Sequence, residues 1–201
     1  MHQIIIISGP SGCGKSTLIH RLLAEFPELV FSVSHTTRPA RPGEVSGRDY
    51  HFVSHPVFQK MKEKNEFAEW AEVHGQCYGT SWREIRAKSN KNRTLVLDLD
   101  VQGTRSITKQ FPEAMTVFVI PPSLAELKKR LRKRELNWSR ETDRRLQMAL
   151  KELRAYGLYD YVIVNRDLEK AFAELRCLVV AFGLQTVRNE KHIKKLIRGR
   201  K

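Results

Sequence analysis

The sequence predicts an α/β protein with a parallel sheet that helices cover on both faces. Short aliphatic runs alternate with longer segments at helical spacing, the pattern of parallel strands joined by helical crossovers. The first run leads into a glycine-rich loop that opens a helix, which is the first half of a βαβ unit. With 201 residues, the chain fits one domain with small insertions.

The elements can be assigned in order. Residues 4–7 are four isoleucines, and their short length and the following Ser-Gly-Pro favour a buried strand. A helix is expected from about Lys15 until Phe26-Pro27 ends its apolar spacing. Further strands are expected at 31–33, 94–100, 116–120 and 161–164. Residues 61–72 are expected to form a helix followed by a short strand. Another helix should begin at a capping box formed by Ser123 and Glu126 and run through Arg134. Two more helices are expected at 146–153 and 168–187.

Two stretches, 34–82 and 126–145, fit the parallel sheet poorly. The first contains a run of Pro, Gly and charged residues between 36 and 54, which is typical of a functional loop region. The second is strongly basic up to Arg134. We expect both to be appended pieces that move against a core formed by 1–33, 83–125 and 146–201.

The composition is that of a globular protein, with 41% hydrophobic and 29% charged residues. Its apolar runs are too short to cross a bilayer and its N-terminus lacks a secretory signal, so we expect neither a membrane partner nor export. Three widely spaced cysteines, Cys13, Cys77 and Cys177, predict reduced thiols in the cytoplasm.

The net charge of +14 indicates anionic partners without choosing among them. Part of this charge lies in residues 188–201, where seven Lys and Arg residues stand against Glu190 alone. We expect a solvated, partly frayed tail there. Attraction of nucleic acid is the minority hypothesis, and no dedicated nucleic-acid site is expected.

Residues 9–16 match the phosphate-binding pattern G-x-x-x-x-G-K-[ST] in full, between a predicted strand and a predicted helix. Glycines let several backbone N–H groups approach a polyphosphate, and the helix N-terminus adds positive potential. Lys15 would reach the β- and γ-phosphates, and Ser16 would offer its hydroxyl to Mg²⁺. The predicted ATP-binding residues of this loop are Gly9, Pro10, Ser11, Gly12, Cys13, Gly14, Lys15, Ser16 and Thr17.

Several further segments resemble those of guanylate kinases, the bacterial single-domain type among the P-loop nucleoside monophosphate kinases. The segments come in the family's order and cover nearly the whole chain: 32–44, 47–53, 67–71, 78–81, 97–103 and 161–165. The resemblance implies a P-loop fold with a small GMP-binding insertion and a helical lid. It implies Mg²⁺-dependent transfer of a phosphoryl group from ATP to GMP, and to dGMP, by a monomer or small homo-oligomer.

The resemblance also implies roles for single residues. The acceptor phosphate would be bound by Ser34, Arg38, Arg41, Tyr50 and Tyr78. The guanine base would be read by Glu69, Thr80 and Asp100. Asp98 would support Mg²⁺ through water, and Asn165 would approach the adenine of ATP. The transferring group would be clamped by Lys15, Arg38 and the lid arginines Arg130, Arg134 and Arg145.

Residue chemistry agrees with these roles. Phosphoryl transfer needs charge neutralisation and in-line placement, and guanidinium groups suit phosphate oxygens. Guanine presents adjacent N1–H and N2–H₂ donors that suit the carboxylate of Glu69, whereas adenine presents an acceptor at N1. Each residue also has a structural alternative: Glu69 and the arginines as surface charges, and the tyrosines as loop packing.

The chain departs from the family pattern at 135–139, where a short glycine-containing turn is usual, and at Arg166, where an aspartate is frequent. Three other functions stay open at this point. They are a non-catalytic guanylate-kinase-like module that binds peptides or proteins, a nucleic-acid-binding ATPase, and a kinase for another monophosphate. The intact phosphate loop argues against the first of these.

Overall fold

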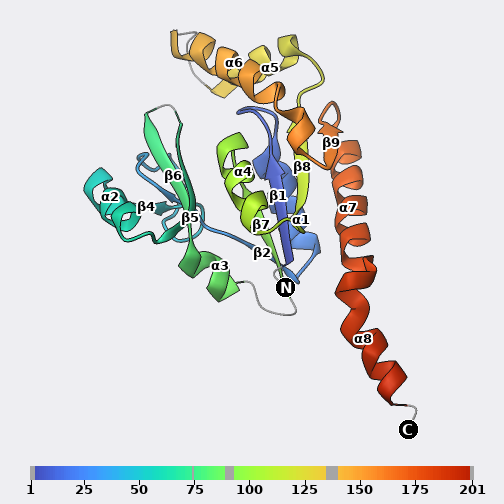
Figure 1. Ribbon diagram of the computed structural model, residues 1–201. Helices are drawn as coiled ribbons and strands as arrows, with labels where there is room; N and C mark the ends of the chain where they lie inside the picture. Colours follow the sequence, from blue (N-terminus) through green and yellow to red (C-terminus); the bar gives the residue numbers. More distant parts are fainter. Residues whose placement is uncertain (1–2, 74, 89–92, 135–139, 200–201) are drawn as a thin grey trace.

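The computed structural model describes residues 3–73, 75–88, 93–134 and 140–199, apart from the side chains of 133, 134 and 140–142. A five-stranded parallel sheet lies at the centre, in the order β2-β7-β1-β8-β9 (Figure 1). Its strands are β1 (Gln3–Ser8), β2 (Leu29–Phe31), β7 (Thr94–Asp98), β8 (Met115–Ile120) and β9 (Tyr161–Val164). The central place of β1 agrees with the complete burial of its isoleucines.

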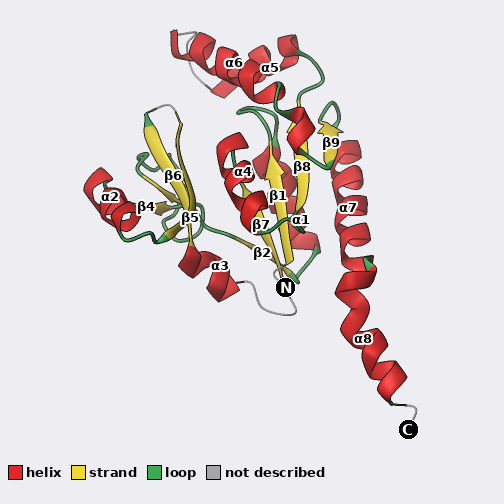
Figure 2. Ribbon diagram, in the orientation of Figure 1, coloured by secondary structure: helices red, strands yellow, loops and turns green. Residues whose placement is uncertain are grey.

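Helices cover both faces of this sheet, as the sequence predicts (Figure 2). Successive side chains of a strand point to opposite faces. Ile5 and Ile7 therefore pack with residues of α1 (Lys15–Glu25) and α7 (Leu168–Leu184). Ile4 and Ile6 pack on the other side with residues of α3 (Trp82–Lys88) and α4 (Val101–Gln110). The carboxyl ends of the strands stay available for ligands.

A second, smaller sheet lies beside the first, in the strand order β4-β3-β6-β5 (Figure 1). Its strands are β3 (His35–Thr36), β4 (His51–Phe52), β5 (Phe67–Val73) and β6 (Gln76–Ser81), and α2 (His55–Glu63) follows β4. Phe58 of α2 stacks on Phe67 of β5 with 4.5 Å between ring centroids. This contact anchors the helix on the sheet that occupies the predicted GMP-binding region.

Two helices, α5 (Leu124–Arg134) and α6 (Arg140–Leu153), lie together over one end of the molecule (Figure 1). Leu127 and Leu131 of α5 pack with Ala149 of α6. Half of the predicted capping box is present, because the Glu126 backbone N–H donates to Ser123 Oγ at 3.1 Å. The Glu126 carboxylate instead accepts from Arg130. A 3₁₀ turn at Tyr156–Leu158 then leads to β9.

The C-terminal segment corrects the sequence analysis. The helix expected over 168–187 ends at Leu184, because Gln185 is extended, and α8 (Thr186–Arg198) follows in place of a partly frayed tail. Glu190 and Lys194, one turn apart, support this helix with an ion pair of 2.7 Å. In Figure 1, α8 extends away from the rest of the molecule.

Other bounds also differ. The second strand covers Leu29–Phe31 rather than 31–33, and α2 begins at His55 with Pro56 in its first turn, before the expected start at 61. Strand β7 ends at Asp98 and not at Asp100. The sequence analysis did not predict β3, β4, β6, α3 or α4. Among the described residues, none of the helices is long and apolar enough to span a membrane.

Candidate active site

The loop between β1 and α1 has a backbone that glycine adopts most easily. The φ angle is 145° at Gly9, 87° at Gly12 and 95° at Gly14. A Cβ atom at Gly9 would collide with the carbonyl oxygen of Val119, and one at Gly14 with the side-chain amide of Asn165. Gly14 is also the N-cap of α1 and has no side chain to bond the first N–H groups. These groups can therefore bind an anion.

Groups from outside the loop hold its shape. Asn165, which is 5% exposed, donates its side-chain N–H to the carbonyl oxygen of Cys13 at 2.8 Å. Leu131 of α5 lies against Gly12, because a Cβ there would be 3.2 Å from its methyl group. The helix pair α5–α6 therefore packs on the loop. The role of Asn165 at adenine stays a prediction, and here its amide braces the loop.

Lys15 in the first turn of α1 faces the carboxyl end of β7. Its Nζ donates to the Gly9 carbonyl and lies 3.8 Å from Oδ1 of Asp98. Burial would lower the pKa of Lys15, but the neighbouring groups together, Asp98 first among them, outweigh it and the pKa is raised. Burial raises the pKa of Asp98, and Lys15 offsets part of that increase. A permanent positive charge is thus fixed beside the loop.

Oxygen ligands stand next to this charge. Ser16 and Thr17 are exposed in the first turn of α1, and the carboxylate of Asp98 is 23% exposed at the end of β7. Mg²⁺ prefers oxygen ligands and keeps several waters, so a hydroxyl and a partly exposed carboxylate fit this ion. Ser16 follows Lys15 in the chain and Asp98 lies beside it, and their role at the metal stays a prediction.

Glu69 of β5 is a buried carboxylate, 6% exposed. A β-bulge between Phe67 and Glu69 shifts the pairing with β6 and directs this side chain. One oxygen accepts the Thr80 N–H at 2.8 Å, and the other lies against Gly103 in the first turn of α4. The pKa of Glu69 is raised to about 7, because burial and the charge of Asp100 raise it by more than the hydrogen bonds of Thr80 lower it.

Asp100 caps α4 and is placed by that helix, because its carboxylate accepts the Gly103 N–H at 2.7 Å. Burial raises its pKa. Nearby, the hydroxyl oxygen of Ser34, just before β3, lies 3.3 Å from that of Thr80 in β6. The structure thus brings together the residues predicted to read the base, at the junction of the small sheet and α4.

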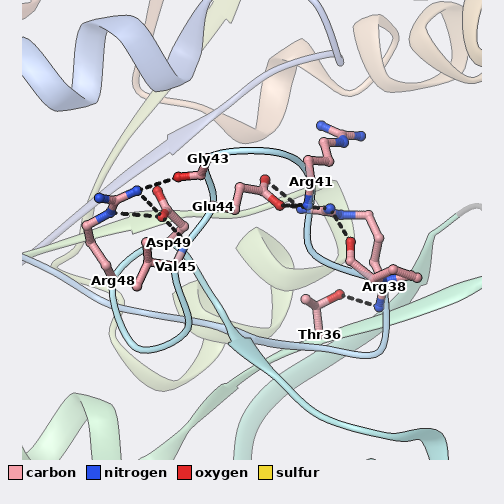
Figure 3. Close-up of polar contacts among 9 residues, drawn as sticks. Thr36, Arg38, Arg41, Gly43, Glu44, Val45, Arg48 and Asp49 are labelled. Carbon is pink, nitrogen blue, oxygen red and sulfur yellow. Dashed lines mark hydrogen bonds and ion pairs between the residues drawn. The ribbon is translucent and has the colours of Figure 1, made fainter.

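The two arginines predicted to bind the acceptor phosphate lie on one loop (Figure 3). Glu44 accepts two hydrogen bonds from the Arg38 guanidinium, at 3.0 and 2.8 Å, and the Arg41 backbone N–H at 2.7 Å. The Arg41 side chain points away from this pair (Figure 3). Sequence reasoning assigned no role to Glu44. The sequence feature that could have indicated Glu44 is its place three residues after Arg41, a spacing that fits a tight turn.

The two tyrosines also gather here. The Arg38 guanidinium lies over the Tyr50 ring at 5.3 Å, and the Tyr50 and Tyr78 ring centroids are 6.0 Å apart. Burial, followed by the charge of Asp98, raises the pKa of Tyr50 to about 12. Tyr50 therefore keeps its hydroxyl proton at neutral pH and can donate it to a phosphate oxygen.

Two of the three predicted lid arginines, Arg130 and Arg145, have side chains that the structure describes. Arg130 donates to the Glu126 carboxylate at 2.9 Å and to the Asn165 carbonyl at 3.0 Å, so it lies at the base of the phosphate loop. Arg145 lies on α6. The side chain of Arg134 lies outside the described part of the chain, as does the divergent segment 135–139.

One further acidic residue was missed by sequence reasoning. Glu152 of α6 and Asp100 line a cavity of about 220 Å³ beside the start of α4. The pKa of Glu152 is raised to about 7, because burial raises it by more than the charge of Lys15 lowers it. A larger cavity of about 960 Å³, lined by His35 and His51 among others, contains none of the predicted site residues.

A strand-loop-helix phosphate site, together with a small sheet that carries a buried carboxylate and a loop with two arginines, defines a P-loop nucleoside monophosphate kinase. Comparison with known proteins gives the particular family. The guanylate kinase family model matches residues 1–181. The chain is 43% identical over 185 residues to guanylate kinase of Geobacter sulfurreducens, covering 92% of this chain and 91% of that one.

Two further comparisons agree. The chain is 41% identical over 199 residues to guanylate kinase of Dechloromonas aromatica, covering 97% of this chain and 98% of that one. A crystal structure of guanylate kinase from Anaplasma phagocytophilum has a TM-score of 0.76 and 31% identity, over 93% of this chain and 89% of that one. The chain belongs to the guanylate kinase family.

Proposed function

We propose that this protein transfers the γ-phosphoryl group of ATP to GMP, and to dGMP, giving ADP and GDP (or dGDP) in purine nucleotide metabolism. The observation that carries the acceptor is the buried Glu69 between Thr80 and the start of α4. Its carboxylate would pair with the adjacent N1–H and N2–H₂ donors of guanine and would be left unpaired against adenine. Membership of the guanylate kinase family supports the same acceptor.

On the donor side, the loop backbone and Lys15 would bind the β- and γ-phosphates of ATP. The Ser16 hydroxyl and, through water, Asp98 would hold Mg²⁺, which neutralises phosphate charge when bound. Asn165 would reach the adenine from the base of the loop. The fixed charge of Lys15 costs no reorganisation at the moment of transfer.

On the acceptor side, Arg38, Arg41, Tyr50 and Tyr78 would hold the GMP phosphate so that one of its oxygens attacks in line. A covalent intermediate is not required, because the acceptor phosphate is itself the nucleophile. Region 34–82 would close over GMP, and the lid, 126–145, would bring Arg130, Arg134 and Arg145 to the transferring group and exclude water.

The three cysteines are free thiols, with Cys13 buried and Cys177 exposed. This state fits a reducing compartment, and we place the reaction in the cytoplasm.

The test is a coupled ADP-release assay with ATP and Mg²⁺, run in parallel with GMP, AMP, CMP and UMP. We expect rapid turnover with GMP alone. Glu69→Gln should reduce GMP turnover by at least about a hundredfold, because a buried base reader is lost. Glu72→Gln is the matched control, since Glu72 is exposed on the same strand. Turnover with none of the four acceptors despite ATP binding would favour a regulatory module, and unchanged GMP use by Glu69→Gln would remove Glu69 as base reader.

A further inference from the structure

Helix α8 has an exposed apolar stripe. Ile193, Leu196 and Ile197 follow the i, i+3, i+4 spacing that places side chains on one side of a helix. Their exposed fractions are 41%, 63% and 69%, and α8 buries none of its residues. An unpartnered stripe of this kind needs a partner that covers it.

The other side of α8 is basic. Lys191, Lys194, Lys195 and Arg198 follow the i, i+3, i+4, i+7 spacing, and a helix turns by about 100° per residue, so this stripe lies nearly opposite the apolar one. Glu190 is the single acidic residue of α8 and is paired with Lys194. The helix therefore combines an apolar face with a surplus of positive charge.

The start of α8 is fixed on the core. The Arg188 guanidinium lies 3.3 Å from the Phe182 ring centroid and donates to the Gln185 side chain at 3.0 Å. Asn189 donates to the Gly183 carbonyl at 3.1 Å. α8 is thus held at a defined corner and extends away from the body (Figure 1). It also lies outside the segment 1–181 that the family model matches, and none of the predicted site residues lies on it.

We propose that α8 binds an anionic lipid surface, lying in the plane of the interface with its apolar stripe inserted among the acyl chains. Amphipathic helices with Lys and Arg on the polar face bind in this way, and long lysine side chains reach headgroups from the polar side. Each cation near an anionic surface adds to the attraction. The binding is peripheral and requires no membrane-spanning segment, but it departs from the sequence-based expectation of no membrane partner.

Two other occupants fit the observations less well. A nucleic acid would use the basic stripe but leave the apolar stripe uncovered. A second copy would cover the apolar stripe, but three side chains on a helix about 20 Å long give a contact far below the roughly 1,200 Å² of a stable interface. A lipid surface satisfies both stripes at once.

The test is co-sedimentation of the full chain with vesicles of phosphatidylcholine alone or mixed with phosphatidylglycerol, at low salt. We expect at least about tenfold stronger binding to the anionic vesicles. Lys191→Gln with Lys195→Gln should weaken that binding about 30-fold, from two lost cations. Leu196→Ser with Ile197→Ser should weaken it by at least about tenfold. The matched control is Lys109→Gln with Lys170→Gln, exposed lysines of α4 and α7 that should change nothing.

Far-UV spectra and thermal midpoints of all variants should match, because every substituted side chain is exposed. Equal binding to neutral and anionic vesicles, or equal loss in the control variant, overturns the proposal. Two results would assign another partner and also overturn it. One is concentration-dependent self-association that the Leu196 and Ile197 variant abolishes without lipid binding. The other is RNA binding that the lysine variant loses and the apolar variant keeps.

Discussion

Among single residues, Glu69 has the most unusual environment in the acceptor site. Its carboxylate is buried and has a pKa raised to about 7, with one hydrogen bond from Thr80 and the like charge of Asp100 nearby. The charged form is therefore poorly solvated until guanine supplies its donors. If Glu69 reads the base as proposed, part of the energy of base recognition would come from relieving this unsatisfied charge.

A pH dependence of GMP binding follows from this environment. The raised pKa means that Glu69 gains a proton as the pH falls through about 7, and the protonated carboxyl cannot accept from both guanine donors. GMP affinity should fall by about tenfold per pH unit below 7. Titration calorimetry between pH 5.5 and 8.5 measures this slope. Glu69→Gln should lose it, while protonation of the GMP phosphate affects both proteins equally. An identical slope in the two proteins would contradict the assignment.

Glu44 supplies a second prediction for a single residue. It fixes Arg38 by two hydrogen bonds and the Arg41 backbone by a third. Glu44→Ala frees both arginines, so we expect the KM for GMP to rise about tenfold with the KM for ATP unchanged. Steady-state kinetics with each substrate varied separately checks this. Glu63→Ala on α2 is the control, and a rise in both KM values would mean that the change has disturbed the whole fold.

The sequence could propose candidate site residues where a chemical requirement fixes the residue type, and it could not where the local fold decides. The phosphate-loop glycines and Lys15 were predictable because phosphate binding demands them. Glu69 was predictable through the family resemblance and guanine chemistry. Glu44 and Glu152 were not, because an acidic side chain is common on surfaces and its partners come from loops and helices that pack only in the folded chain.

At the scale of elements, the proposed acceptor site is a junction between strand β5 and helix α4. Gly103 lets the first turn of α4 approach the Glu69 carboxylate, and a Cβ there would lie 2.8 Å from Oε2 of Glu69 and 3.3 Å from Oδ1 of Asp100. The absence of a side chain at Gly103 therefore sets the distance between β5 and α4.

Gly103→Ala should displace Glu69 and raise the KM for GMP by at least about tenfold, because a small misplacement of a binding group is costly. ATP binding should be unaffected. Gly183→Ala in α7 is a matched control, since a Cβ at Gly183 meets nothing within 4 Å and should stabilise the helix by about 0.5–1 kcal/mol. Comparable kinetics for the two variants would show that the approach of α4 does not position Glu69.

Prediction of elements succeeded where apolar residues form a run or a clear period. Strands β1, β7, β8 and β9 are such runs, and all lie in the central sheet. Strands β3 and β4 have two residues each, and their existence depends on pairing with distant segments. α8 was missed because its many charged residues conceal a short apolar period. The Glu190–Lys194 ion pair and the contact of Arg188 with Phe182 stabilise this helix.

At the scale of the whole molecule, the chain consists of a central sheet with two attached parts, the small sheet and the helix pair α5–α6. The helix pair packs on the phosphate loop through Leu131 and Arg130. The small sheet reaches the core through Glu69 and the start of α4. Each proposed substrate site would therefore lie against a different attached part, and we expect each substrate to close its own part on the core.

We expect GMP to bring the small sheet toward the core. Energy transfer between a dye on the exposed Cys177 of α7 and a dye on Glu63→Cys of α2 reports this distance. The labelled protein also carries Cys77→Ser so that Cys77 takes no dye, and Cys13 is buried and should not react. GMP should raise the transfer efficiency, because guanine binds groups on both sides of the junction, whereas a non-hydrolysable ATP analogue alone should change it little. The transfer efficiency of a dye pair within the core, on Cys177 and Lys109→Cys, should stay constant.

Constant transfer in the first pair with saturating GMP would mean that the small sheet is already placed for catalysis. Exclusion of water would then depend on the lid alone.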